Sequence, residues 1–249
     1  MLPDRSPLIG ARLMFKQSTT LVAAIAILVA LLLSALAALK QYPDDLSLLG
    51  DHRQLAAELR ILILKRRDAL LNDLASPIAG NPEADVALVS FFDYNCLPCR
   101  AAGLNIQQAI RDDANVKLVF KEFPVLGSNS EFAAGAALAS RQQRKYEAFH
   151  LALMNFPGVV NKRTTLTIAG RVGLDVEQLK RDMEDPAIAD AIARNRALAS
   201  GLHITGTPAL VVGDEVIPGV VDLVRLQRAI ADTRATAKAQ PTTSADLAF

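Results

Sequence analysis

The sequence predicts an α/β protein whose small parallel sheet is interrupted by an inserted block of helices. Residues 86–92 have the pattern of a strand, 96–112 that of a helix and 116–120 that of a second strand. This strand–helix–strand order is typical of a parallel sheet. Residues 128–200 show helical spacing throughout, and strand signals return only at 209–217. The late strands complete the sheet that the early strands begin, so the helical block is predicted to be an insertion.

The bulk composition excludes several classes of protein. The chain has 249 residues, a formal net charge of +1 and no tryptophan. This length suits one medium domain with an insertion and a leader. Because there is no strongly basic field, we expect no nucleic-acid partner. Only two cysteines are present, so no framework of structural disulfides can form.

The N-terminal region contains an apolar run over residues 21–39, with Ser34 as its one mild polar exception. A run of about 19 apolar residues can just span a bilayer as a helix. A secretory signal also has a basic start, an apolar middle and a small-residue exit, and Ala35–Leu36–Ala37 supplies such an exit. Residues 1–40 are therefore expected to be either a cleaved signal peptide or a membrane anchor. Both alternatives place the rest of the chain outside the cytosol.

Residues 41–82 are predicted to form an amphipathic leader helix and a linker. A charged helix is expected over 51–74, and Ser76–Pro82 is rich in residues that break secondary structure. The helix either packs on the neighbouring domain or holds several copies of the chain together. Its apolar stripe consists of Leu55, Leu59, Leu62 and Ile63.

The catalytic domain is predicted to cover residues 83–234, with the helical insertion at about 128–200. Its first strand is nearly continuous apolar sequence, which suits a central strand covered on both faces. Gly213–Asp214 is a candidate hairpin turn, and Asp222 can cap a closing helix. Residues 235–249 are rich in Ala, Thr, Pro and Ser, and we expect a disordered tail there.

The two cysteines stand three residues apart, in Cys96–Leu97–Pro98–Cys99. Disulfide exchange needs one thiolate to attack a sulfur and a second thiol to resolve the mixed disulfide. At a helix start, free N–H groups and the helix dipole stabilise a thiolate. We therefore expect Cys96 to attack from the exposed tip and Cys99, one turn further in, to resolve. Pro98 is tolerated because a first-turn residue has no helical partner for its amide.

Two other uses of the cysteine pair are disfavoured. One Cys-x-x-Cys can be half of a zinc site, but the chain offers only His52, His150 and His203 and no second cysteine pair. No metal site is therefore expected. A purely structural disulfide across three residues would constrain almost nothing.

A second motif, Thr205–Gly206–Thr207–Pro208, precedes a strand signal. The bond before a proline can be cis at modest energetic cost. A cis Pro208 would expose the backbone of Thr207, which could then pair with an extended segment of a substrate. Thr207 and Pro208 are therefore candidate site residues.

Three ordered motifs carry a family resemblance: Phe91–Cys99, Phe120–Pro124 and Gly206–Pro208. Together they resemble the DsbA-like family of thioredoxin-fold thiol–disulfide oxidoreductases, and most closely the branch of copper-sensitivity-suppressor type C proteins. The resemblance covers about residues 84–233. It implies a thioredoxin fold with an inserted helical domain, a periplasmic location, exported protein substrates and a cis Pro208 facing Cys96. It also implies no bound cofactor, because the two sulfurs carry the redox equivalents.

The sequence departs from this family at two places. Six residues before the first cysteine, relatives commonly carry a buried acid that moves protons near the second cysteine, whereas this chain has Ser90. Either Glu122 does this work or water does; alternatively, Glu122 is an ordinary strand-end carboxylate paired with Lys121. The residues between the cysteines lack the histidine found in strongly oxidising relatives, so a less oxidising potential is expected.

The leading functional hypothesis is a periplasmic oxidase that introduces disulfides into exported proteins and is recycled by a membrane redox partner. It would be either released after signal cleavage or anchored in the inner membrane by residues 21–39. A disulfide isomerase or reductase is favoured instead if residues 51–74 make the chain a homo-oligomer. An alternative from another class is a copper-handling binding module that uses the same two sulfurs.

Overall fold

The computed structural model describes residues 9–41 and 44–239, which divide into two compact units, Met1–Leu55 and Ala56–Phe249. The first unit contains α1 (Ile9–Gln41), which includes the apolar run of the leader, and the beginning of α2 (Asp44–Lys65). Within the described residues, no helix meets the combination of length and apolarity that crossing a membrane requires.

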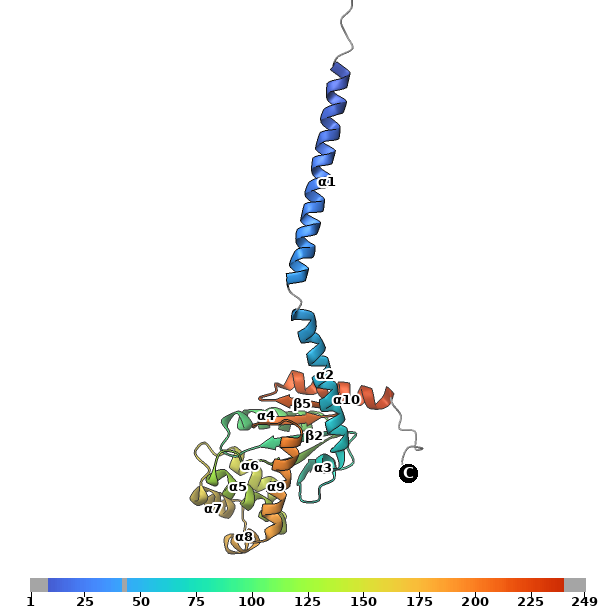
Figure 1. Ribbon diagram of the computed structural model, residues 1–249. Coiled ribbons are helices and arrows are strands. Elements are labelled where there is room, and N and C mark those ends of the chain that lie inside the picture. The colour runs from blue at the N-terminus through green and yellow to red at the C-terminus, as the bar shows by residue number, and fades with distance from the viewer. Residues whose placement is uncertain (1–8, 42–43, 240–249) are drawn as a thin grey trace, which may run out of the picture. The chain divides into compact units, whose positions relative to one another are not determined.

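The second unit is built on a five-stranded mixed sheet in the order β1-β3-β2-β4-β5 (Figure 1). Its central strands β2 and β3 are parallel, while the other neighbours pair antiparallel. The strand–helix–strand prediction is confirmed, since α4 (Leu97–Asp112) joins the two parallel strands. The hairpin at Gly213–Asp214 is also confirmed. The strands are β1 (Ile78–Gly80), β2 (Val86–Phe92), β3 (Val116–Glu122), β4 (Ala209–Val212) and β5 (Glu215–Pro218).

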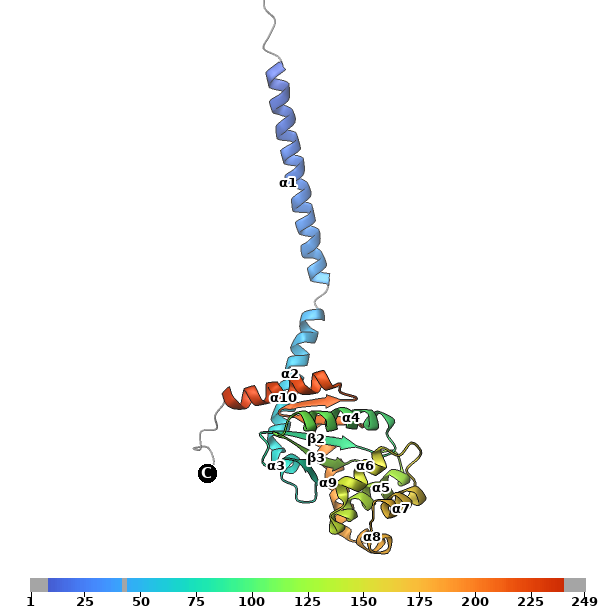
Figure 2. The ribbon, with the colours of Figure 1, turned by 180° about the vertical axis from the view of Figure 1, so that it is seen from behind.

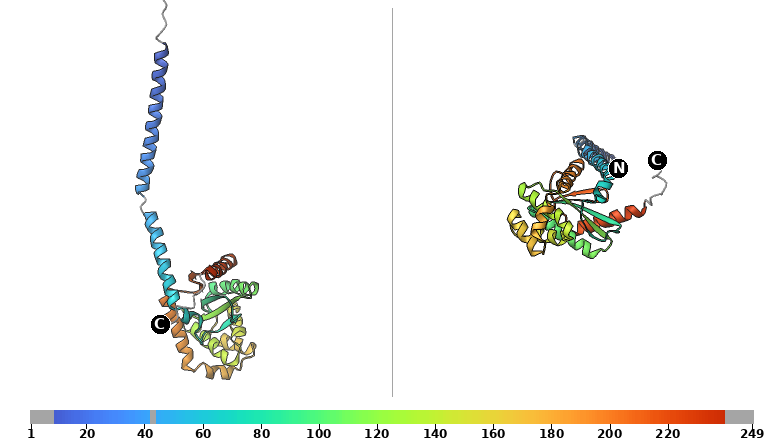
Figure 3. Two further views of the ribbon diagram at one scale, coloured as in Figure 1. Left: turned by 90° about the vertical axis from the view of Figure 1, so that its right-hand side faces the viewer. Right: turned by 90° about the horizontal axis from the view of Figure 1, so that it is seen from below.

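Helices cover both faces of the sheet, as the apolar sequence of β2 predicts. Alternate residues of a strand point to opposite faces, so Leu88 joins one core with α4 and α10 (Leu223–Ala239), and Val89 joins another. This second core is closed by α2, α3 (Arg67–Leu71) and α9 (Pro186–Gly201). The view from below in Figure 3 shows these two groups of helices on opposite sides of the strands.

The helical insertion lies between β3 and β4 in the chain and is confirmed over almost the predicted range. Its short helices gather at one end of the sheet (Figure 2), where α6 packs against α4 and α5. Much of α5 is alanine, which lets neighbouring helices approach closely. The remaining elements are α5 (Ser128–Ala139), the 3-10 turn η1 (Ser140–Gln143), α6 (Tyr146–Met154), α7 (Lys162–Arg171) and α8 (Val176–Asp182).

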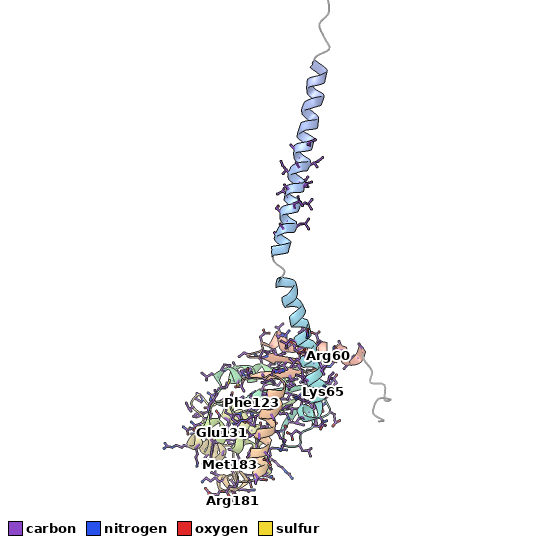
Figure 4. The ribbon with its side chains drawn as sticks, in the orientation of Figure 1. Arg60, Lys65, Phe123, Glu131, Arg181 and Met183 are labelled. Atoms are coloured by element: carbon purple, nitrogen blue, oxygen red, sulfur yellow. The ribbon has the colours of Figure 1, made fainter. Side chains whose placement is uncertain are left out.

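The predicted linker over residues 76–82 is wrong in part, because it contains the edge strand β1. Gly80 makes this possible: its φ is +79°, and a Cβ there would lie 2.6 Å from the backbone oxygen of Val116. The compact unit also begins earlier than residue 83. The predicted stripe residue Ile63 is buried in the core with Leu70 of α3, so this part of the leader packs on the domain. Figure 4 shows Arg60 and Lys65 on the same helix, with Phe123 beyond the end of β3.

The predicted tail begins too early. Asp222 caps the closing helix as expected, since its Oδ1 accepts the N–H of Arg225 at 2.8 Å. Residues 235–239, however, continue α10. Alanine has the highest helix propensity, and this stretch is alanine-rich, so the helix extends. Residues 240–249, also predicted to be disordered, lie outside the described residues.

Candidate active site

Cys96 is the N-cap of α4, and the structure holds both cysteines as free thiols. The backbone N–H of Cys99 donates to the Sγ of Cys96 at 3.2 Å. The sulfur thus takes the place that a serine or aspartate oxygen usually takes at a helix start. Pro98 stands in the first turn, where no N–H is required. The predicted arrangement of one thiol at the tip and one a turn further in is present.

The two thiols have opposite tendencies to ionise. Hydrogen bonding from the Cys99 thiol, supported by the Thr207 side chain and the Cys99 amide, lowers the pKa of Cys96 to about 6. The same hydrogen bond and burial raise the pKa of Cys99 well above its usual value. At neutral pH the pair therefore holds one thiolate, on Cys96, and one proton, on Cys99.

The expected exposure of Cys96 needs correction. The residue is only 5% exposed, against 1% for Cys99, so the difference between them is small. The loop that carries Thr207 lies across the helix tip, and the Cys96 thiol lies 3.4 Å from the backbone oxygen of Thr207. Leu97, by contrast, is 70% exposed. The exposed side chain next to the buried Cys96 sulfur is therefore that of Leu97.

The Thr207–Pro208 bond is cis, which confirms that expectation. The structure thus brings together four of the five predicted site residues: Cys96, Cys99, Thr207 and Pro208. They come from α4 and from the loop before β4, which are more than a hundred residues apart in the chain.

Asp93 lies in the loop between β2 and α4 and organises the backbone before the helix. It is 1% exposed, and its Oδ1 accepts the N–H of Asn95 at 2.7 Å and the hydroxyl of Ser130 at 2.7 Å. Its Oδ2 accepts the N–H groups of Val125 and Leu126 at 2.8 and 3.0 Å. Ser130 therefore serves this carboxylate and not the helix cap that its sequence position suggests. Asp93 fixes the backbone that places Cys96.

A cavity of about 190 Å³ lies beside the buried thiol, between α4, α6 and the sheet. Cys99, Ser90, Pro208 and His150 all line it, among mostly apolar side chains. Ser90 is on the central strand and is 7% exposed. The position where relatives carry an acid thus does face the second cysteine, with a hydroxyl in place of a carboxylate.

Comparison with known proteins agrees with this geometry. Residues 87–231, more than half of the chain, match the DSBA-like thioredoxin domain. The chain belongs to this family. Its DsbA-like domain includes both cysteines and the Thr207–Pro208 loop. The family is one of thiol–disulfide oxidoreductases, and its solved structures include a thiol–disulfide exchange protein, alpha-DsbA2 of Wolbachia pipientis, which is 31% identical with a TM-score of 0.67 over 71% of this chain and 96% of that one.

Solved structures in this family superpose on the domain. A thioredoxin-like oxidoreductase from Silicibacter pomeroyi is 52% identical, with a TM-score of 0.67 over 68% of this chain and 98% of that one. The catalytic domain of Proteus mirabilis ScsC is 29% identical, with a TM-score of 0.65 over 71% of this chain and 98% of that one. The resemblance to the copper-sensitivity-suppressor branch is thereby confirmed.

The curated relatives match this chain over only part of their own length. Disulfide bond formation protein D of Bacillus subtilis is 26% identical over 169 residues, covering 62% of this chain and 75% of that protein. A sodium/proton antiporter of Salinispora tropica, NhaA 3, is 25% identical over 166 residues. This match covers 66% of the chain but only 26% of the antiporter, so the chain spans about a quarter of that relative.

Glu122, the fifth predicted site residue, is not among the residues that line the cavity beside Cys99. It is 1% exposed, and its Oε1 accepts the hydroxyls of Tyr94 and Tyr146 at 2.7 and 2.8 Å. Its Oε2 has no hydrogen-bond partner among the described residues. Burial raises the pKa of Glu122 to about 8, although the two tyrosine hydroxyls oppose the rise. The alternative pairing with Lys121 is wrong, because that side chain lies on the opposite face of the sheet.

The sequence analysis missed three residues that surround Glu122. Tyr94 and Tyr146 bind its carboxylate, and Nδ1 of His150 lies 3.1 Å from the hydroxyl of Tyr94. Burial lowers the pKa of His150 to about 3, so the imidazole is neutral. One signal was available: Tyr146 and His150 are four residues apart in a predicted helix and therefore share a face. Nothing in the sequence placed Tyr94 beside that face.

Proposed function

We propose that this protein exchanges disulfides with exported proteins in the periplasm, with Cys96 as the attacking thiol and Cys99 as the resolving thiol. One observation carries the proposal: the Cys96 sulfur caps α4 and receives the backbone N–H of Cys99. Such a sulfur ionises easily and is a good leaving group as well as a nucleophile. The adjacent backbone of Thr207 supports a role for that residue in holding an extended segment of the substrate.

The oxidase direction is favoured over reduction. A disulfide is a strong oxidant when its reduced form is stabilised, and hydrogen bonds to the Cys96 sulfur stabilise the reduced form here. A membrane redox partner would then restore the Cys96–Cys99 disulfide. Because no histidine stands between the cysteines, we expect a potential that is less oxidising than that of relatives with one. A redox titration against glutathione measures it.

The cysteine roles are tested by titrating the Cys96 thiolate and by trapping. The rate of alkylation of the reduced protein should rise with a midpoint near pH 6. In Cys99→Ala the midpoint should move up toward the ordinary cysteine value of 9.0, because the largest stabilising hydrogen bond is lost. The same variant should accumulate mixed disulfides with proteins of a periplasmic extract. Cys96→Ser serves as the control, and it should trap none.

Two results would refute this proposal. One is a Cys96 thiol that titrates like free cysteine in the wild-type protein. The other is equal trapping by the Cys99→Ala and Cys96→Ser variants, which would show that the adducts do not form at Cys96.

A second candidate, disulfide isomerase, is favoured by the outer surface of α2. Ile61 and Leu64 are 51% and 54% exposed, although this part of the helix otherwise packs on the domain. Exposed apolar residues on a helix can bring copies of a chain together, and clustered sites could hold a misfolded substrate. Light scattering on the full chain decides the oligomeric state, with Ile61→Asp as the matched variant. A monomer would remove the support for isomerase function.

A further inference from the structure

We propose that Glu122, Tyr94 and His150 form a proton relay that serves Cys99 across the cavity lined by Ser90. The inference rests on the proposed function, because Cys99 must gain or lose a proton only if the pair exchanges disulfides. It assigns a path to the proton of Cys99. Ser90 is not an acid that could take this proton, and Glu122 makes no direct contact with Cys99.

The relay begins with a chain of hydrogen bonds inside the domain. The hydroxyl of Tyr94 lies 2.7 Å from Oε1 of Glu122 and 3.1 Å from Nδ1 of His150. A tyrosine hydroxyl has a single proton, and in Tyr94 that proton is used in the hydrogen bond to the Glu122 carboxylate. The hydrogen bond to His150 therefore requires Nδ1–H as the donor. This tautomer leaves Nε2 without a proton and able to accept one.

The cavity connects His150 to the buried thiol. His150, Ser90 and Cys99 line the same space of about 190 Å³, which has room for several water molecules next to polar partners. The ring itself is held in place by aromatic neighbours, with Phe92 and Phe120 at 4.9 and 4.6 Å between ring centroids. A fixed ring with an unprotonated nitrogen, lining a cavity with room for water, is suited to passing a proton.

The proton is needed when Cys99 reacts. During recharging, the Cys96 thiolate attacks a disulfide and forms a mixed disulfide, and Cys99 then attacks the Cys96 sulfur and expels the other thiolate. Cys99 must lose its proton for this second step. The proton passes through water to Nε2 of His150, Nδ1 gives its proton to Tyr94, and Tyr94 gives its own to Glu122.

These proton transfers balance, and neither Tyr94 nor His150 is left charged at the end. Tyr94 ends unchanged, His150 changes only its tautomer, and Glu122 becomes protonated. The path runs in reverse when a substrate thiolate breaks the Cys96–Cys99 bond and Cys99 leaves as a thiolate that needs a proton. Because burial raises the pKa of Glu122 to about 8, the acid is mostly protonated at neutral pH and ready for the reverse direction, and its ionised fraction, which grows toward pH 8, accepts the proton in the forward direction.

Other charged groups reach the cavity and could compete. Arg100 and Arg111 line it from α4, and Glu147 lines it from α6. The guanidinium of Arg100 donates to the backbone oxygens of Tyr94 and Gly158, so it organises the loop. Glu147 is the only acid among the lining residues that the structure describes, so a Glu147→Gln variant must be included as a competitor.

The test separates the two steps of the reaction of the reduced protein with glutathione disulfide. The first step, adduct formation at Cys96, does not involve the proton of Cys99; the second, release of glutathione by Cys99, does. Because the chain has no tryptophan, acid quenching followed by mass spectrometry is the suitable readout. Tyr94→Phe cuts the relay, and Tyr146→Phe removes an equivalent hydrogen bond to the same Glu122 oxygen but leaves the path intact.

We expect Tyr94→Phe to form the adduct at a rate within twofold of wild type and to resolve it about 100-fold more slowly, within the range of general acid–base catalysis. The slowing in D₂O that the wild type shows in the second step should shrink. Glu147→Gln should resolve the adduct like wild type, and Tyr146→Phe should resolve it much faster than Tyr94→Phe. Circular dichroism melting confirms that each variant is folded.

Every other outcome is informative. Wild-type resolution by Tyr94→Phe, or equal slowing by the two tyrosine variants, overturns the relay and leaves the proposed function standing. Slow resolution by Glu147→Gln alone assigns the proton to that acid and also overturns the relay. If no adduct forms at Cys96 in the wild-type protein, the proposed function itself fails.

Discussion

Two neighbouring residues of β3, Lys121 and Glu122, point to opposite faces of the sheet and are 0% and 1% exposed. The Lys121 ammonium donates to the backbone oxygen of Ala69 and the hydroxyl of Ser76, both at 2.7 Å, and lies 3.7 Å from a carboxylate oxygen of Asp73. Among the residues that the structure describes, the carboxyl group of Glu122 has both its hydrogen bonds on one oxygen and none on the other.

The two groups differ in how completely their hydrogen bonds are satisfied. Burial moves both groups toward neutrality, lowering the pKa of Lys121 to about 8 and raising that of Glu122 to about 8. Lys121 is nevertheless surrounded by acceptors that hold α3 and its following loop on the domain. Glu122 keeps one oxygen, Oε2, without a hydrogen bond among the described residues, so its carboxyl group is incompletely satisfied. An incompletely satisfied buried acid is a candidate for chemistry.

The largest effect is expected from Glu122→Gln, through the pH dependence of stability. Glu122 has a pKa of about 8 in the folded protein, against 4.5 ordinarily. The folded state therefore favours the protonated acid, and the wild type loses stability as pH rises from 4.5 to 8. The variant lacks this loss, so it should be more stable than wild type by on the order of 3 kcal/mol at pH 7 and equal to it near pH 4.

Urea unfolding of both reduced proteins between pH 4 and 8 measures this difference. A difference that does not change with pH would mean that Glu122 is ionised in the folded state, as a fully satisfied structural carboxylate would be. The comparison with Lys121 would then lose its basis. The same variant should also slow the resolution of the glutathione adduct, which links the stability measurement to the relay.

Lys121→Met is expected to lower the stability of the protein, by somewhat less than Glu122→Gln raises it at pH 7. The apolar side chain fills the same space but leaves the Ala69 oxygen and the Ser76 hydroxyl without a donor. Since Asp73 keeps partial exposure and a second cation, Arg194, at 3.8 Å, the loss should be about 2–3 kcal/mol. Both steps of the glutathione reaction should keep wild-type rates. A change in the resolution rate would show that the two faces of β3 are not independent.

The sequence alone was sufficient for the elements whose signal is local. The continuous apolar run of β2, the proline one residue after the helix start and the turn at Gly213–Asp214 each determine a piece of backbone by themselves. The cysteine pair was predictable in the same way, because its spacing and its place at a helix start can be read from neighbouring residues. The edge strand β1 was missed because its only requirement is a tertiary contact: Gly80 lies against the backbone of Val116.

The cluster around Glu122 was out of reach for the same reason. Tyr94, Tyr146 and His150 come from a loop and from the inserted helices, and only the packing of α6 on the sheet brings them together. A charged strand residue such as Lys121 or Glu122 normally indicates solvent. Burial of both, on opposite faces, depends on α3 and α6 covering the sheet, and no residue pattern within β3 shows this.

The smallest effect on stability is expected at an exposed ion pair, with which the effects at the buried groups can be compared. Nε of Arg60 on α2 lies 2.6 Å from Oδ2 of Asp214, with 48% and 42% of the two side chains exposed (Figure 4 labels Arg60). Solvent screens such a pair, so a double-mutant cycle with Arg60→Ala and Asp214→Ala should give a coupling of about 0.2–1 kcal/mol that disappears in high salt. A coupling as large as the Lys121→Met effect would mean that the contact between α2 and the β4–β5 turn excludes water. The side of the sheet that α2 and α3 cover would then be stabilised by this surface ion pair as well as by the buried Lys121.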